Sequence, residues 1–183
     1  TYAIAAGNRA TASGSSTTAF GSRAEALGNY STAIGRSTVA NADYSVAIGY
    51  KTNAYSYGET AIGLYNTIYT AVDTNGYNAA DRLFVIGNGT GSSARSDALV
   101  VYKSGNMELN GTLTIDSSYT FPSTDGSVNQ VLTTNGAGTL SWSNDANTDD
   151  QIIEQFRFTG DSLFIALEND GVPEVAVDLS GLR

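Results

Sequence analysis

The sequence predicts an all-β protein whose first third is a solenoid of short parallel strands, and three observations lead to that class. A tetrad ending in glycine returns every 14 residues between Ile4 and Gly63, alanine holds one phase throughout, and Gly, Ser, Thr and Asn fill most of the intervals. A fixed period without insertions is typical of units that each stack on a neighbour. The tetrads are Ile4-Ala5-Ala6-Gly7, Thr18-Ala19-Phe20-Gly21, Thr32-Ala33-Ile34-Gly35, Val46-Ala47-Ile48-Gly49 and Thr60-Ala61-Ile62-Gly63.

Weaker copies of the tetrad lie midway between the strong ones, as in Glu25-Ala26-Leu27-Gly28, so alanine recurs at every seventh position. A period of seven also suits a coiled coil, which needs large apolar residues at two positions of each heptad and helix formers elsewhere. Here glycine or another small residue ends most units, and each glycine costs a helix about 1 kcal/mol relative to alanine. The helical interpretation is therefore excluded.

Each tetrad reads as a short strand, because side chains alternate between the two faces of a strand. In the third complete copy, Val46 and Ile48 point to one face and Ala47 to the other, and the following glycine allows a turn with positive φ. Two strands make one coil, and coils are expected to stack at about 4.8 Å. The alanines then fill a narrow interior, while one column of large apolar residues faces outward on one side only.

That outward column needs a cover, since a contiguous exposed apolar patch signals an interface. We expect identical chains to supply it around a threefold axis; a monomeric solenoid capped by another domain is the alternative. The expected interface residues of this homotrimer are Phe20, Ile34, Ile48 and Ile62 in the repeat, with Phe156 and Ile165 in the last module.

The repeated block Ser45-Val46-Ala47-Ile48-Gly49 resembles the head of the YadA-like trimeric autotransporter adhesins. This resemblance covers residues 4–63 and implies a left-handed parallel β-roll with three chains side by side; we expect the head repeats to occupy residues 1–66. We identify no YadA-like neck, heptad stalk or membrane anchor in the remainder of the sequence.

Residues 67–80 have no repeat spacing and are expected to connect the roll to a second region. Residues 81–143 contain short strands with Asn-Gly and Ser-Gly turns, which are hairpin signals. Two blocks there, 81–90 and 128–136, are similar to segments of phage tail fibres and bacterial surface fibres. The resemblance implies an intertwined trimeric β shaft, because these strands are too sparse to bury a core within one chain.

Residues 144–183 are expected to form a small trimeric β module. Three apolar stretches, 152–158, 162–168 and 174–179, are separated by Gly160-Asp161 and Asn169-Asp170-Gly171, which predicts a three-stranded meander. A module of this size buries too little surface to fold alone without disulfides or a metal, whereas three copies in a prism bury enough.

Composition limits the function. The chain of 183 residues has no cysteine and no histidine, and its net charge of −9 comes mostly from the last module. Nucleic-acid binding needs a basic footprint, which this balance does not supply. Without a start methionine, signal peptide or long apolar run, we expect an excised piece with no membrane insertion, from a protein at the bacterial cell surface or in a virion tail fibre.

Three motifs imitate chemical sites. Gly160-Asp161-Ser162-Leu163 spells the block of a serine hydrolase family, but the chain has no histidine to act as the triad base. The glycine-rich stretch 87–91 lacks the lysine and helix of a phosphate loop. Residues 145–149 start like a calcium loop, but Asp150 stands where glycine belongs and Phe156 where glutamate belongs. We expect no enzyme activity, no cofactor and no metal.

Tyrosine is abundant, with 11 copies, and Tyr30 and Tyr44 stand one coil apart in the same phase. Stacked rings offer rigid amphipathic area to sugars or protein surfaces. The alternative is a cross-strand ladder that stabilises the roll. The candidate ligand surface is Tyr30, Tyr44, Tyr55 and Tyr57.

Three functions are consistent with this pattern. The first is a structural and adhesive piece of a trimeric cell-surface fibre, which presents a binding surface to a glycan or to a receptor on a host or prey cell. The second is a phage tail fibre of the same architecture that recognises a host receptor. The third is a polysaccharide-cleaving spike, which the absence of an evident carboxylate pair in the roll argues against.

Overall fold

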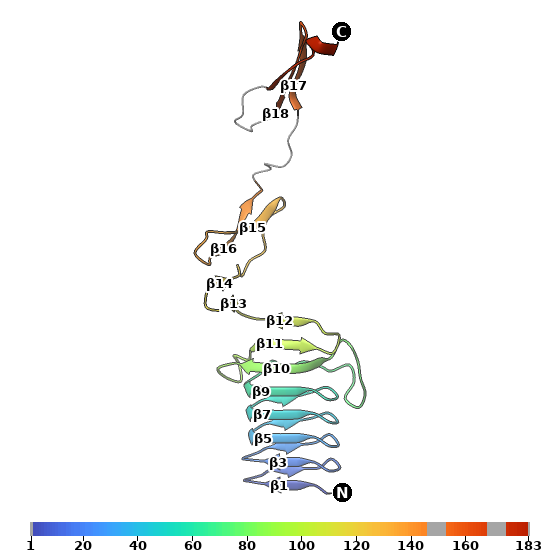
Figure 1. Cartoon of the computed structure of the whole chain (residues 1–183). Coiled ribbons are helices and arrows are strands. Elements are labelled where there is room, and N and C mark those ends of the chain that lie inside the picture. Colours follow the sequence, from blue (N-terminus) through green and yellow to red (C-terminus); the bar gives the residue numbers. More distant parts are fainter. Residues whose placement is uncertain (1, 146–152, 168–174, 183) are drawn as a thin grey trace. The chain divides into compact units, whose positions relative to one another are not determined.

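The computed structural model describes residues 2–145, 153–167 and 175–182, and it is all-β in that part of the chain. The single helical element there is a 3-10 turn, η1 (Ser180–Leu182). The chain divides into two compact units, residues 1–113 and 114–183. Figure 1 shows the first unit as a stack of strands and the second as separate small sheets.

The first unit is built on an eight-stranded sheet in the order β1-β3-β5-β7-β9-β10-β11-β12. Every strand from β1 to β10 pairs in parallel with the next, and the repeat tetrads align position for position, so that Ile34 lies opposite Ile48 and Gly35 opposite Gly49. The strands are β1 (Ile4–Ala6), β3 (Thr18–Phe20), β5 (Thr32–Arg36), β7 (Val46–Tyr50), β9 (Thr60–Leu64), β10 (Arg82–Asn88), β11 (Asp97–Tyr102) and β12 (Met107–Leu109).

The weaker half-copies form the other wall of each coil, a four-stranded parallel sheet in the order β2-β4-β6-β8. Its strands are β2 (Thr11–Ala12), β4 (Glu25–Ala26), β6 (Val39–Ala40) and β8 (Asn53–Ala54). The expected β-roll with two strands per coil is confirmed.

Alanine fills the interior because the two walls of a coil lie close together. Ala33, Ala47 and Ala61 on one wall, and Ala26, Ala40 and Ala54 on the other, have no solvent exposure. Small hydroxyl side chains accompany them in the turns; the Ser31 hydroxyl, for example, donates a 2.6 Å hydrogen bond to the Gly28 carbonyl. The interior is therefore complete within a single chain.

Glycine at the end of each long strand is required by close approach as well as by its backbone angle. Gly35 has a φ of 131°, and a Cβ built on it lies 1.9 Å from the Gly49 carbonyl oxygen. That distance is far inside van der Waals contact, so any side chain at this position collides with the backbone of the next coil.

The roll extends further than the sequence predicted. Residues 81–143 were expected to belong to the shaft, whereas β10 pairs in parallel with β9, and β11 and β12 continue the same sheet in antiparallel fashion. Here Val85 and Val100, which are cross-strand neighbours in the sheet, are buried in place of the alanines of the regular coils. The boundary between the units falls after Leu113 rather than at residue 81.

A side chain closes the shorter sheet. Asn66 is fully buried, its Oδ1 accepts a 2.8 Å hydrogen bond from the Asn53 backbone N–H, and its Nδ2 donates a 2.8 Å hydrogen bond to the Asn53 carbonyl. The Asn66 amide thus takes the place of the backbone of a further strand beside β8, because it pairs with both the N–H and the carbonyl group of Asn53.

The second unit consists of small antiparallel pairs. One is β13 (Thr114–Ile115) with β14 (Tyr119–Thr120), and another is β15 (Gln130–Thr134) with β16 (Leu140–Asn144). The ring of Trp142 lies against Gly126 and donates a 2.8 Å hydrogen bond from Nε1 to the Thr124 carbonyl. The predicted intertwining of three such chains stays a prediction.

The last sheet is the expected three-stranded meander. Its strands are β17 (Ile153–Thr159), β18 (Ser162–Leu167) and β19 (Val175–Asp178), in the order β17-β18-β19 with antiparallel pairing. Gly160 and Asp161 form the turn between the first two strands, as expected.

Candidate functional site

The expected interface residues of the roll form one continuous column. Phe20 pairs with Ile34, Ile34 with Ile48 and Ile48 with Ile62 along the sheet. Phe20 is 60% exposed, Ile34 37% and Ile48 39%, while Ile62 is half-buried. The prediction that this column points out of the coil is confirmed, although nothing in the described residues shows what covers it.

The column has one rung more than the sequence predicted, because Ile86 of β10 lies opposite Ile62. The signal for it was present: Phe84-Val85-Ile86-Gly87 has the same pattern as Thr60-Ala61-Ile62-Gly63. It was missed because the interval between these two tetrads is longer than the regular 14 residues.

The last sheet places Phe156 opposite Ile165, so the two expected interface residues of this module form a cross-strand pair. Phe158, opposite Leu163, extends the same face by one pair. Phe156 and Phe158 are 61% and 64% exposed, and their rings meet edge to face at 6.0 Å. This sheet therefore has a large apolar face that is open within one chain.

The candidate ligand tyrosines are only partly brought together. The rings of Tyr30 and Tyr44 stack at 4.8 Å with an interplanar angle of 16°, and Tyr57 meets Tyr44 edge to face at 5.4 Å. Tyr55 contacts Tyr69 instead, at 5.5 Å. We call the edge formed by Tyr30, Tyr44 and Tyr57 the tyrosine edge.

The backbone holds the tyrosine edge in register. Tyr30 and Tyr44 have left-handed φ values of 57° and 58°, and the Tyr44 N–H donates a 2.8 Å hydrogen bond to the Asn29 carbonyl one coil away. Asp43 accepts a 2.6 Å hydrogen bond from the Asn29 backbone N–H, and Asn29 in turn accepts one of 3.0 Å from the Ser15 N–H. Successive turns are thus linked by both backbone and side chains.

A buried carboxylate lies where the regular coils end. Glu59 has no solvent exposure, and its Oε2 accepts hydrogen bonds from the backbone N–H groups of Tyr55 (2.7 Å) and Ser56 (2.9 Å) and from the Tyr69 hydroxyl (2.9 Å). Its Oε1 has no hydrogen-bond donor within the described residues. Burial raises the pKa of Glu59 despite these donors.

An ion pair completes this end of the roll. Arg82 lies 3.2 Å from Asp97, and the same carboxylate accepts hydrogen bonds from the backbone N–H and the hydroxyl of Thr67. Burial lowers the pKa of Lys103, whose Nζ donates a 2.8 Å hydrogen bond to the Ser56 hydroxyl. Arg82, Asp97 and Lys103 each have a polar partner at this end of the roll, so these groups form a closing layer.

The hydrolase-like block, one of the motifs that imitate chemical sites, lies in the described residues and has a structural explanation. In the hydrolase-like block, Gly160 and Asp161 are turn residues and Ser162 begins β18. The calcium-like stretch 145–149 lies mostly outside the described residues. Within the described ranges, no group of three or more acidic, histidine or cysteine side chains has an arrangement that would hold a metal ion. No helix in the same ranges has the length and apolar character of a membrane span.

Stacked coils with an interior of alanine define the first unit as a β-solenoid of the β-roll class. Residues 1–24 and 26–52 match the YadA head domain repeat as two copies, so this N-terminal part is a YadA-like head segment of the trimeric autotransporter type. Comparison with curated proteins and with solved structures gave no match. The resemblance of residues 81–143 to tail fibres therefore stays a prediction from sequence.

Proposed function

We propose that the chain is part of a homotrimeric, extracellular surface fibre that presents a binding surface to another cell. YadA head repeats are extracellular parts of surface adhesins, which supports this placement. The observation that carries the proposal is the in-register column Phe20, Ile34, Ile48 and Ile62, of which the first three are exposed and the last half-buried although the coil behind them is already complete.

The column has the character of an interface between copies. Its members repeat at the spacing of the coils, so an identical column on a second and third chain matches it rung by rung. Contiguous exposed apolar area of this kind is costly in water unless it is covered. Two sister chains, packed around a left-handed roll as the resemblance implies, cover it on all coils at once.

The chain offers a matched pair of variants for the test. Ile34 and Leu27 are equally exposed, at 37%, but belong to the two different walls of the roll. We expect Ile34→Asp to convert a trimer into monomers in light scattering, and Leu27→Asp to leave the trimer intact. A monomeric unmodified chain, or equal effects of the two substitutions, contradicts the proposal.

For the adhesive part of the function, we propose that the tyrosine edge contributes to the binding surface together with Tyr55. Tyr30 and Tyr44 are 53% and 51% exposed, so their ring edges and hydroxyls are accessible in the single chain. The stacking of one ring on the next also supports the alternative, a ladder of rings that stabilises the roll.

A further inference from the structure

The two edges of the roll differ in charge. All basic residues of residues 1–66 lie at the ends of the long strands or in the turns that follow them, and those turns contain no acidic residue. The opposite turns contain the tyrosine edge and Asp43 but no basic residue. We call the first of these the basic edge, formed by Arg9, Arg23, Arg36 and Lys51 together with Arg95 from the loop between β10 and β11.

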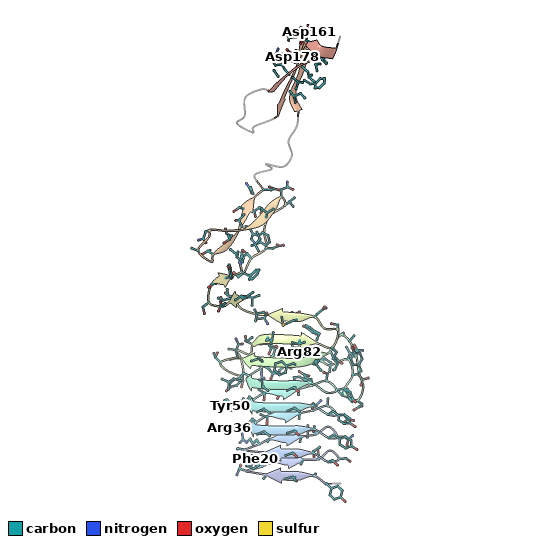
Figure 2. All side chains as sticks on the ribbon, in the orientation of Figure 1. Phe20, Arg36, Tyr50, Arg82, Asp161 and Asp178 are labelled. Carbon is teal, nitrogen blue, oxygen red and sulfur yellow. The ribbon has the colours of Figure 1, made fainter. Side chains whose placement is uncertain are left out.

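Backbone hydrogen bonds stack these turns directly on one another. The Arg23 N–H donates to the Asn8 carbonyl at 2.8 Å, and the Lys51 N–H donates to the Arg36 carbonyl at 2.9 Å. The basic residues therefore form a column along the coils, with turns repeating at about 4.8 Å. Figure 2 shows Arg36 and Tyr50, from neighbouring coils, at the same edge of the roll.

Three of the five basic residues occupy a backbone conformation that favours glycine. Arg9, Arg23 and Lys51 have φ values of 57°, 56° and 53°, in the left-handed region. This conformation costs an L-residue with a side chain about 1 kcal/mol, a cost that glycine avoids. Gly58 occupies the corresponding position in a turn of the other edge, so the fold accepts glycine there. Ser37 and Tyr65 have the same left-handed conformation in the other turns of this edge, so the conformation belongs to the turn and fixes where each side chain leaves the backbone.

Two tyrosines lie among the cations. Tyr50 and Tyr65 meet edge to face at 5.0 Å, the Arg36 guanidinium lies 5.4 Å from the Tyr50 ring centroid, and Arg95 lies 5.8 Å from that of Tyr65. The Lys51 ammonium lies within 5.9 Å and 5.5 Å of the two centroids. A hydrogen bond from Tyr65, with the charges of Arg36 and Lys51, lowers the pKa of Tyr50.

Neutral oxygens and rings, rather than carboxylates, surround these cations. Lys51 Nζ donates a 2.9 Å hydrogen bond to the Ser92 hydroxyl, and Arg95 donates to the carbonyls of Lys51 (3.2 Å) and Asn66 (2.8 Å). Arg9, Arg23 and Arg36 are exposed, and none of the three forms an ion pair with a carboxylate of the described residues. The positive charge of the edge is therefore available to an external anion.

We propose that the basic edge binds an acidic polysaccharide that runs along the stack of coils. A guanidinium binds a carboxylate or sulfate through two parallel hydrogen bonds, while the tyrosine rings and hydroxyls suit the apolar faces and hydroxyls of sugar rings. The cations repeat along the coils, and the charges of an acidic polysaccharide repeat along the polymer. Many weak contacts can therefore form at once and add to the affinity.

A polysaccharide fits the edge better than a nucleic acid. The chain has a net charge of −9, which repels any polyanion, and double-stranded DNA concentrates one charge per about 1.7 Å. An acidic polysaccharide has fewer charges per unit length than DNA, so the net negative charge repels it less, and its sugar rings can also contact the tyrosines. This inference rests on the proposed function in one respect, since it takes the roll to be exposed outside the cell.

The test uses the full chain with polygalacturonate, its methyl-esterified neutral form and single-stranded DNA, each immobilised. We expect binding to polygalacturonate that weakens with salt, and binding at least about tenfold weaker to the ester and to DNA. Binding that is equal for acid and ester, stronger for DNA, or absent overturns the proposal.

Two variants locate the site. Arg36→Gln with Lys51→Gln is expected to weaken polygalacturonate binding about tenfold. Arg157→Gln in β17 also removes a positive charge, but lies off the edge, and is expected to leave binding unchanged. Equal losses overturn the assignment to this edge. Light scattering of the same samples separates the two claims: a trimer that does not bind contradicts only the basic edge, whereas a monomer contradicts the proposed fibre.

Discussion

The two units bury their side chains in different ways. In residues 1–113, the alanines, Val85 and Val100 form an interior that is shielded within one chain. In residues 114–183, no side chain whose exposure is described is buried, and Phe156, Phe158 and Val177 are 61%, 64% and 45% exposed. A repeat of small residues makes a coil that is complete in itself, whereas a few short hairpins need other chains to provide an interior.

The same contrast explains where trimer formation matters. In the proposed trimer of the roll, association would cover one outer column and leave the interior as it is. For the last sheet, the proposed association would supply the interior itself, since Phe156, which pairs with Ile165, is 61% exposed and no described side chain of this sheet is buried. We therefore expect the second unit to depend on trimer formation more strongly than the roll does.

The largest expected loss of stability comes from placing a side chain between two coils of the roll. Gly35→Ala places a Cβ 1.9 Å from the Gly49 carbonyl oxygen at a φ of 131°, and we expect it to destabilise the roll by about 4 kcal/mol or more. Gly136→Ala in the second unit also has a positive φ, 77°, but meets no atom within 4 Å. It is expected to cost about 1 kcal/mol.

Thermal unfolding followed by circular dichroism compares these two glycine variants. Gly91→Ala, with open space around its Cβ and no positive φ, is the control and is expected to behave like the unmodified chain. If Gly35→Ala and Gly136→Ala lower the melting temperature by similar amounts, the close contact between coils at Gly35 is not what makes glycine necessary there.

A smaller effect concerns the carboxylate at the end of the roll. Burial raises the folded-state pKa of Glu59 above its ordinary value of 4.5, so the protonated form is favoured in the folded chain. The stability that this group contributes is present below pH 4.5 and is lost as the pH rises through the raised pKa.

Glu59→Gln removes this titration. We expect the melting temperature of the variant, relative to the unmodified chain, to increase between pH 4 and pH 8 because only the unmodified chain has to bury a charge. Other carboxylates titrate equally in both proteins and cancel in the comparison. A difference that stays constant over this range contradicts the assignment.

The smallest expected effect separates the two roles of the tyrosine edge. Removing the stacked pair by Tyr30→Ala with Tyr44→Ala is expected to cost the roll about 1 kcal/mol if the rings act as a ladder. Tyr2→Ala, at a residue that is 91% exposed, is the control and is expected to have no effect. A glycan array completes the experiment: hits that the double variant weakens support a ligand surface, and hits that it leaves unchanged contradict one.

Periodicity made the roll predictable, because a fixed spacing of alanine and glycine leaves few ways to stack the chain. The alternation in Val46-Ala47-Ile48 predicted which side chains face inward, and Ala47 is fully buried as expected. The added rung at Ile86 was not predicted, since the connection before β10 is longer than the others and the 14-residue spacing does not continue across it.

Other features depend on contacts that spacing does not encode. Asn66 closes the edge of β8 only because the chain returns to that point after the last regular coil. Tyr55 and Tyr57 are close together in sequence but contact different rings, Tyr69 and Tyr44. The basic edge became evident only once the turns were seen to stack, because Arg36 stands one position before the phase that Arg9, Arg23 and Lys51 share, and Arg95 comes from a separate loop.

The most direct test of the central claim is whether water reaches the apolar column. The chain has no cysteine, so Ile34→Cys and Leu27→Cys each introduce a single thiol at positions of equal exposure in one chain, 37%. We predict that a polar maleimide labels the native Leu27→Cys protein readily and the native Ile34→Cys protein only after unfolding. Equal labelling of the two native proteins would mean that no sister chain covers the column, and would contradict the fibre.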